Sequence, residues 1–167
     1  CESWPLVPAD TWARPDTLKE WTDRGKDLAR FSRDYRALNR TFNPTAFDPE
    51  AWADLAAAAG ARYVTFTTKH HDGFCMFDTS TTDYRITHPD CPFHTHPRAN
   101  VTREVFEAFQ KKGLGIGCYF SKSDWNSPFY WAPDFPVTDR HPNYDTQKFP
   151  DRWQSFVAFV HRQVEEL

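Results

Sequence analysis

The sequence predicts an α/β protein, and two observations support this prediction. Helix-like and strand-like patterns alternate along residues 48–167, in the order helix, strand, helix, strand, helix. The helix-to-strand connections are very short, whereas the strand-to-helix connections are long, at about residues 69–101 and 121–149. This order calls for parallel strands joined by right-handed crossovers. Because binding sites are commonly built at the carboxyl ends of such strands, we expect the functional residues in these two loops.

Capping residues and apolar periodicity predict three helices. The first begins at Asp48 and Pro49, an N-cap and a first-position proline, and ends at Gly60. The second covers about residues 102–112, and the third runs from near Pro150 to the last residue. By helical spacing, the expected buried residues are Trp52, Leu55, Ala56 and Ala59 in the first helix, Val105, Phe106 and Phe109 in the second, and Trp153, Phe156, Val157, Val160, Val164 and Leu167 in the third.

Two segments between these helices are predicted to be strands. Residues 63–68 are β-branched or aromatic, and residues 114–120 alternate large and small side chains. One face of the second strand is expected to pack on helices and consists of Leu114, Ile116, Cys118 and Phe120. The other face carries Gly115, Gly117 and Tyr119, so Tyr119 is expected to point inward at the carboxyl end of the strand.

The small residues on one strand face indicate the kind of fold to which the strands belong. Near-empty positions suit the crowded interior of a barrel, and two parallel strands alone would leave unpaired edges. We therefore predict a partial (β/α)8 TIM-like barrel, roughly strands two and three with their helices. The chain is expected to be a fragment of one barrel domain, with residues 1–47 as a lead-in and residues 48–167 as the α-β-α-β-α segment. Within the lead-in, residues 17–39 are charged and partly helical in pattern.

Composition excludes several classes of protein. The 167 residues are 40% hydrophobic and 26% charged, as in a folded domain. The net charge of −3 and the lack of a polybasic run argue against nucleic acid or an anionic membrane surface as a partner. No apolar stretch is long enough to span a membrane, and no signal-peptide pattern occurs. Glycine-rich phosphate motifs and the G-x-S-x-G motif are also missing, so we expect no nucleotide cofactor and no serine hydrolase.

The four cysteines form no C-x-x-C pair. Cys118 lies in the second predicted strand, and its thiol is expected to be buried. A disulfide between Cys75 and Cys91 remains open, as does the redox compartment.

The first loop opens with His70, His71 and Asp72 directly after a strand. The histidines could hydrogen-bond a polyhydroxylated ligand, bind a metal, or serve as one structural and one solvated residue. Asp72 precedes a glycine and is best explained by turn chemistry. The same loop contains His88, His94 and His96, but its prolines offer no rigid frame for a metal, so a solvated loop is favoured.

The second loop is rich in aromatic residues. Trp125 and Tyr130, if exposed beside the strand end, would suit stacking on the apolar face of a sugar. For Phe129 and Trp131 we favour a hydrophobic cluster that folds the loop onto the domain. Asn100 fits a glycosylation sequon, yet its place before a helical pattern favours an N-cap.

Residues 59–74, which contain the run Lys-His-His-Asp-Gly-Phe at 69–74, resemble the α-L-fucosidases of glycoside hydrolase family twenty-nine. The resemblance extends over roughly residues 38–167 and includes residues 113–121 and the Asp124-Trp125 pair. It implies a (β/α)8-like catalytic barrel that removes terminal α-L-fucose from fucosylated glycans with retention, through a covalent fucosyl-enzyme. It also implies a periplasmic or secreted protein that needs no cofactor or metal.

The resemblance also implies roles for particular residues. His70 and His71 resemble the pair that hydrogen-bonds fucose hydroxyls, and Tyr119 resembles the tyrosine that lines the same pocket. A Glu-Trp pair of the family would correspond to Glu20 and Trp21, or to Glu2 and Trp4.

The chain departs from the family pattern in three places. The family's His-Trp-Gly element is absent, residues 99–102 replace an Arg-Asp-Val segment, and the nucleophile and the acid/base are expected beyond Leu167. We therefore expect this segment to be inactive by itself. Two alternatives stay open: a non-catalytic carbohydrate-binding fragment, and a metal-dependent TIM-barrel hydrolase that uses His70 and His71.

Overall fold

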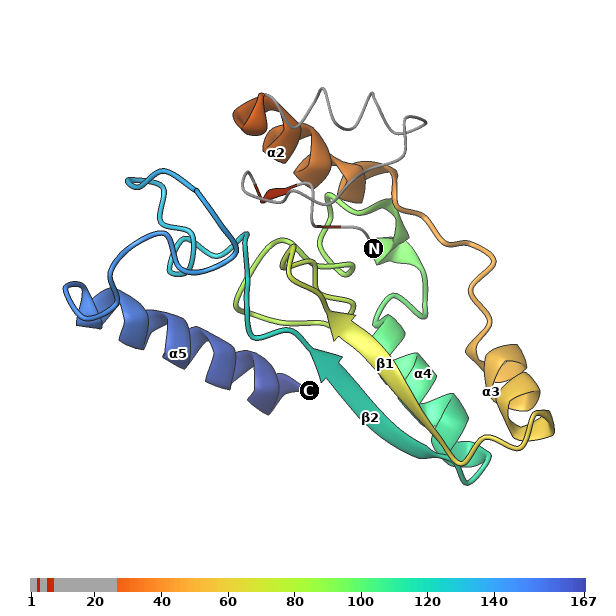
Figure 1. Cartoon of the computed structure of the whole chain (residues 1–167). Coiled ribbons are helices and arrows are strands. Elements are labelled where there is room, and N and C mark those ends of the chain that lie inside the picture. The colour runs from red at the N-terminus through yellow and green to blue at the C-terminus, as the bar shows by residue number, and fades with distance from the viewer. Residues whose placement is uncertain (1–2, 4–5, 8–26) are drawn as a thin grey trace, which may run out of the picture.

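Two parallel strands with helices on their flanks form the centre of the computed structural model, which describes residues 3, 6–7 and 27–167 (Figure 1). The elements are α2 (Leu28–Arg36), the 3₁₀ helix η3 (Ala37–Thr41), α3 (Pro49–Ala58), β1 (Tyr63–Lys69), the 3₁₀ helix η4 (Pro92–Thr95), α4 (Val101–Lys111), β2 (Gly115–Phe120) and α5 (Pro150–Glu166). The α/β class and the order of the five predicted elements are confirmed. Helix α2 falls within the charged segment whose pattern was partly helical.

Strands β1 and β2 pair in parallel, as predicted, with Val64 opposite Ile116 and Thr67 opposite Tyr119. Val64 packs against the main core, so Ile116 lies on the same, helix-facing side of the sheet. Tyr119 is three residues further on and therefore points to the opposite, open face. The predicted place of Tyr119 on the face opposite to the helices is thus confirmed, and the barrel interior on that side stays a prediction.

The helix-facing side of β2 is less covered than expected. Ile116 is 36% exposed and Cys118 is exposed, so the prediction of a buried Cys118 thiol is wrong. The core under α3 and α4 gathers β1 residues and Leu114, whereas α5 runs towards the carboxyl end of β2 instead of lying along it (Figure 1).

Helix α3 begins as predicted but buries a different face. The Asp48 carboxylate accepts a hydrogen bond from the backbone N–H of Ala51, at 3.0 Å. Trp52 and Leu55 are 47% and 72% exposed, whereas Ala53 is fully buried. The prediction of a buried Trp52 and Leu55 is therefore wrong, because the side of α3 that carries Ala53 faces the core shared with α4.

Helices α4 and α5 follow their predicted patterns more closely. In α4, Val105 and Phe109 are buried, and the Asn100 side chain caps the helix by accepting a hydrogen bond from the Arg103 N–H at 3.2 Å. In α5, Phe156 is buried, but Val164 is 53% exposed and the fully buried neighbour is Gln163. The prediction for Val164 is wrong because the polar Gln163 meets buried polar partners, described below.

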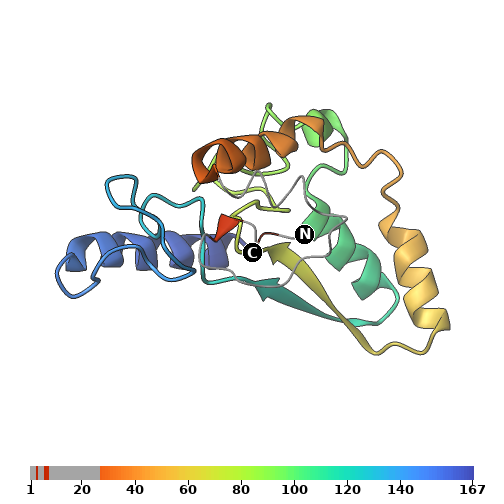
Figure 2. The same ribbon diagram turned by 45° about the horizontal axis from the view of Figure 1, so that its top comes forward.

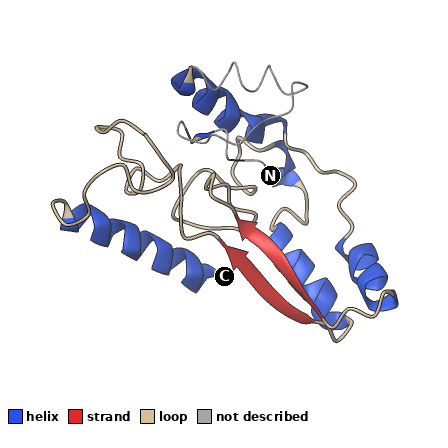
Figure 3. Cartoon of the chain, in the orientation of Figure 1, coloured by secondary structure: helices blue, strands red, loops and turns tan. Residues whose placement is uncertain are grey.

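Both long loops leave the sheet at the carboxyl ends of β1 and β2, and α2 lies over this edge (Figures 2 and 3). A second core of aromatic residues joins α2, the loop of residues 121–149 and α5; its buried members include Phe31, Tyr35, Trp125, Tyr130, Trp131 and Phe156. The edge of the sheet where we expected the functional residues is therefore packed against α2, the second loop and α5.

Cys75 and Cys91 are free thiols, so the disulfide considered between them does not form. Within residues 3, 6–7 and 27–167, no helix combines the length and apolar character needed to cross a bilayer.

Candidate active site

The turn that carries the histidine pair is fixed at the carboxyl end of β1. The Gly73 N–H donates to the His70 carbonyl at 3.0 Å, and Gly73 has a φ of +83°. The buried Asp72 carboxylate accepts from the Phe74 N–H at 3.1 Å, which is the predicted turn chemistry. Its other oxygen accepts from the Tyr35 hydroxyl at 2.7 Å, so Asp72 also anchors α2. Sequence reasoning did not identify Tyr35.

His70, His71 and Tyr119 lie together, although Tyr119 comes from the neighbouring strand. The two imidazole rings are 4.4 Å apart between centroids, and the His70 ring stacks on Tyr119 at 5.8 Å. Both histidines are half-buried, and Tyr119 is 42% exposed. The His70 Nδ1 atom is also 2.8 Å from the Ser3 hydroxyl. The structure therefore unites three of the residues predicted to bind substrate; the other two, Glu20 and Trp21, lie outside the described residues, as do Glu2 and Trp4.

His71 lies in surroundings that favour its neutral form. Burial and the neighbouring His70 lower the pKa of His71 below its usual value, and Asp72 opposes this shift. Its Nδ1 atom hydrogen-bonds the hydroxyl of Ser121, and its ring lies 5.0 Å from that of Trp125. An uncharged imidazole is suited to polar recognition of a ligand.

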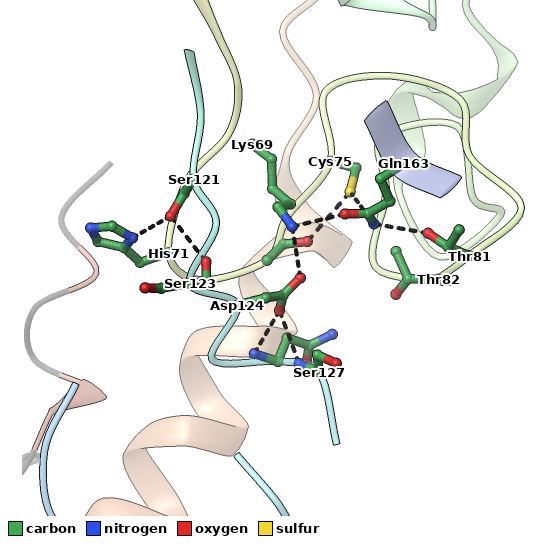
Figure 4. A network of polar contacts seen from close by, with 12 residues as sticks. Lys69, His71, Cys75, Thr81, Thr82, Ser121, Ser123, Asp124, Ser127 and Gln163 are labelled. Atoms are coloured by element: carbon green, nitrogen blue, oxygen red, sulfur yellow. Dashed lines mark hydrogen bonds and ion pairs between the residues drawn. The ribbon is translucent and has the colours of Figure 1, made fainter. Parts of the chain in front are cut away.

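A buried ion pair lies directly behind the histidine turn (Figure 4). Lys69 is fully buried, and its ammonium donates to Asp124 Oδ2 at 3.1 Å and to Gln163 Oε1 at 2.8 Å. The ammonium also lies 4.2 Å from the centre of the Phe120 ring. Two oxygen acceptors and the face of one aromatic ring thus surround the ammonium and compensate the buried charge.

Asp124 connects this ion pair to the second loop. Its Oδ1 atom accepts from the N–H groups of Asn126, at 3.0 Å, and Ser127, at 2.9 Å. Neither Lys69, Asp124 nor Gln163 was predicted as a functional or supporting residue. A lysine that continues a strand of otherwise apolar and hydroxyl side chains was the available signal for Lys69.

The two loops touch closely at Gly73. A Cβ atom built on Gly73 would lie 2.4 Å from Asp124 Oδ1 and 2.8 Å from Asn126 Cβ. The Trp125 N–H also donates to the His71 carbonyl at 2.8 Å. Only glycine fits both the backbone conformation and the space at this position.

The aromatic residues of the second loop are mostly internal. Trp125 is 1% exposed and stacks on Trp131 at 5.1 Å, and Tyr130 is also buried. The prediction that exposed Trp125 and Tyr130 stack on a sugar is therefore wrong, because the loop folds back onto α5. The predicted cluster role is confirmed for Trp131, whereas Phe129 is 38% exposed.

The other histidines of the first loop contact their own loop. His94 Nδ1 donates a hydrogen bond to the Cys91 carbonyl at 2.8 Å, and the His96 ring stacks on Phe93 at 4.5 Å. His88 Nδ1 accepts from the Asp90 N–H at 3.2 Å. Among the residues that the structure describes, no three His, Cys, Asp or Glu side chains are placed to hold a metal ion.

A cavity of about 560 Å³ opens beside His70, between β1 and the α2–η3 segment. Most of its lining surface is apolar, and its polar residues are Asn39, Thr67, Lys69, His70 and Asp72. Its size and lining are typical of small-molecule sites.

Comparisons with known proteins point in one direction. The family model for alpha-L-fucosidase matches residues 11–167. The human tissue alpha-L-fucosidase is 30% identical over 154 residues, which cover 87% of this chain and 31% of the human protein. The putative alpha-L-fucosidase 1 of Oryza sativa subsp. japonica is 37% identical over 95 residues, or 57% of this chain and 18% of that protein. The chain thus spans less than a third of the human relative's length.

Solved structures give the same result. The alpha-L-fucosidase isoenzyme 1 of Paenibacillus thiaminolyticus aligns with a TM-score of 0.59 and 41% identity, over 75% of this chain and 28% of that one. A trapped covalent intermediate of the GH29 alpha-L-fucosidase of Bacteroides thetaiotaomicron, with 2-fluoro-fucosyl fluoride, aligns with a TM-score of 0.66 and 26% identity, over 98% and 34% of the two chains.

Proposed function

The chain belongs to the α-L-fucosidase family, and from this premise we propose that the complete protein hydrolyses terminal α-L-fucosides of fucosylated glycans. The observation that carries the proposal is the cluster of His70, His71 and Tyr119 at the carboxyl edge of the sheet. Half-buried imidazole and phenol groups offer the donors and acceptors that a polyhydroxylated sugar needs, and the adjoining cavity is large enough for a monosaccharide.

We further propose that β1 and β2 are strands two and three of a (β/α)8 barrel. The parallel pairing, the short helix-to-strand connections and the site at the carboxyl ends support this assignment. Gly115 and Gly117 lie on the open face, where an added Cβ would come within 3.2 Å of Tyr63 Cβ and 3.4 Å of the Thr65 hydroxyl. Such close approach between strands suits the filled interior of a barrel.

The reaction itself needs two carboxyl groups about 5–5.5 Å apart if the configuration is retained. The two buried carboxylates beside the histidines, Asp72 and Asp124, already accept hydrogen bonds from Tyr35 and Lys69 and from backbone N–H groups. We therefore assign them to support. The nucleophile and the acid/base are proposed to come from parts of the complete protein outside the described residues, and we propose no activity for this segment alone.

The test uses the protein expressed from its complete gene and an aryl α-L-fucoside. We expect His71→Ala to lower kcat/KM by at least about tenfold, which corresponds to roughly 1.4 kcal/mol of transition-state binding. His161→Ala is the matched control, because His161 is an exposed histidine of α5. No hydrolysis of α-L-fucosides by the complete wild-type protein would overturn the proposed function, and unchanged kinetics of His71→Ala would remove His71 from the site.

A further inference from the structure

We propose that Ser121 is a positioning residue that fixes the tautomer of His71, so that His71 recognises a sugar hydroxyl as a hydrogen-bond acceptor. The inference deepens the proposed function and rests on it for the identity of the ligand. It concerns a serine to which no role has been assigned so far. The serine and the histidine leave neighbouring strands and meet at the carboxyl edge of the sheet (Figure 4).

The hydrogen atoms around Ser121 determine the tautomer of His71. The Ser121 hydroxyl has one hydrogen, which it donates to the Ser123 carbonyl at 3.0 Å. A carbonyl oxygen can only accept, so this hydrogen is committed. The same hydroxyl oxygen hydrogen-bonds His71 Nδ1, and in that bond it must be the acceptor. His71 Nδ1 therefore carries the hydrogen, and in the neutral ring Nε2 carries a lone pair.

The position of Ser121 makes this arrangement persistent. Ser121 is 4% exposed, and its backbone N–H donates to the Lys69 carbonyl at 3.1 Å. His71 is held on its other side, because its carbonyl accepts from the Trp125 N–H at 2.8 Å. Behind both residues, the Lys69–Asp124 ion pair fixes the start of the second loop. The hydroxyl and the ring therefore meet between two segments that are each tied to the sheet.

The charged and titratable groups around His71 agree with a neutral ring. Among the described residues, His70 and Asp72 flank it in the turn and the Trp125 ring lies 5.0 Å from it, whereas Tyr119 stacks on His70. Burial and His70 outweigh the opposing effect of Asp72 on the pKa of His71. A neutral ring with a hydrogen on Nδ1 is an acceptor at Nε2, and its natural ligand is a hydroxyl hydrogen.

The consequence is a rule of selectivity. An acceptor at Nε2 binds a sugar with a hydroxyl at the contacted carbon more tightly than one with a hydrogen, a fluorine or a methyl ether there, because none of these can donate a hydrogen bond. His70 is different, since its contact with the Ser3 hydroxyl allows either nitrogen to carry the hydrogen. The two adjacent histidines would then have distinct roles, one acceptor fixed by Ser121 and one adaptable group.

The first test measures the tautomer directly in the wild-type protein and uses one variant only to assign the signals. The complete protein is prepared with isotope-labelled histidine, and nitrogen NMR at about pH 7.5 identifies the bare ring nitrogen of each neutral histidine. Nε2 couples to both carbon-bound ring hydrogens and Nδ1 strongly to one, and the His71 signals are those absent from His71→Gln. We expect Nε2 of His71 to be bare. A hydrogen on Nε2 would overturn the proposal, whether or not the protein hydrolyses fucosides.

The second test links Ser121 to the ligand. Free histidine prefers the hydrogen on Nε2, so Ser121→Ala should let Nε2 become a donor and should raise KM for an aryl α-L-fucoside about fivefold, the size of one lost hydrogen bond, with kcat largely kept. The penalty should vanish for the monodeoxy-fucoside that lacks the contacted hydroxyl. Ser155→Ala, which removes a similar hydroxyl-to-carbonyl bond from exposed α5, is the control and should change neither constant. Equal penalties for Ser121→Ala on the parent fucoside and on every monodeoxy-fucoside would overturn the proposal.

Discussion

The loops of residues 70–100 and 121–149 leave neighbouring strands at the same edge, yet they contribute different kinds of residues. The first carries the half-buried pair His70 and His71, of which His70 lines a cavity. The second carries groups that are almost wholly buried, Asp124 and Trp125 at 1% exposure each. The first loop therefore holds the candidate ligand contacts, and the second holds the residues that keep them in place.

The second loop is suited to support because its own structure is closed. Trp125 donates from its indole N–H to the Arg140 carbonyl at 3.2 Å, and the Asn143 amide donates to the Ala132 and Phe135 carbonyls, both at 2.9 Å. These bonds satisfy loop backbone groups that would otherwise be buried without partners. The candidate binding groups and the residues that orient them therefore lie on separate segments, so each set can be tested by itself.

The largest effect is expected where the two loops share the buried ion pair. Lys69→Met leaves the Asp124 carboxylate buried without its cation, and breaking a buried pair from one side costs about 3–5 kcal/mol. The measurement is the shift of the denaturation midpoint in urea for the complete protein. Lys122→Met, at an exposed lysine of the same loop, should leave the midpoint nearly unchanged. Equal midpoints for the two variants would contradict the supporting role of the second loop.

A smaller effect is expected at Gly73, where the loops touch. Gly73→Ala combines a left-handed backbone, at a cost of about 1–2 kcal/mol, with overpacking against Asp124, at about 1–3 kcal/mol. Gly60→Ala is an informative partner, because Gly60 has a φ of +77° but no atom within 4 Å of the added Cβ. It should show the backbone cost alone in thermal unfolding. If both variants lose the same stability, the close contact between the loops has no energetic weight.

The smallest effect concerns the titration of His71 in the first loop. Its pKa is lowered in the folded protein, so the unfolded chain binds more protons between that pKa and the ordinary value of about 6.5. The stabilisation is fully present above about pH 6.5 and is lost as the pH falls through the folded pKa. Unfolding at graded pH should show a shallower acid-side decline for His71→Phe than for wild type. If the stability of both proteins declined equally with falling pH, the acid-side loss would arise from groups other than His71.

Local sequence patterns predicted the features that depend on neighbouring residues. The caps at Asp48 and Asn100 and the two strands follow from capping chemistry and from strand propensity. The family resemblance implied that His70, His71 and Tyr119 share one pocket, and the structure brings them together. Parallel strands bring their carboxyl ends together, so even Tyr119 could be placed beside residues far away in the sequence.

Features that depend on three-dimensional packing were not predicted. Periodicity places Trp52 and Leu55 on one face of α3, but it does not tell which face of the helix is buried. In the structure the buried face is the one that carries Ala53. Lys69 and Gln163 are 94 residues apart, and no local pattern pairs a lysine with a distant glutamine. The buried residues that support the site could therefore not be predicted from the sequence, whereas its candidate ligand contacts could.

Because β2 is only partly covered, its Cys118 thiol is accessible to chemical labelling. It is the exposed one of the three described cysteines, while Cys75 and Cys91 are buried, and burial raises the pKa of all three thiols. Because alkylation requires access to the sulfur atom, an alkylating dye should label the strand and spare the interior. A fluorophore attached there would sit on the outer side of the sheet, opposite the face that carries Tyr119. Its brightness and anisotropy would report how tightly that side is enclosed in any longer form of the protein, without disturbing the histidine pair.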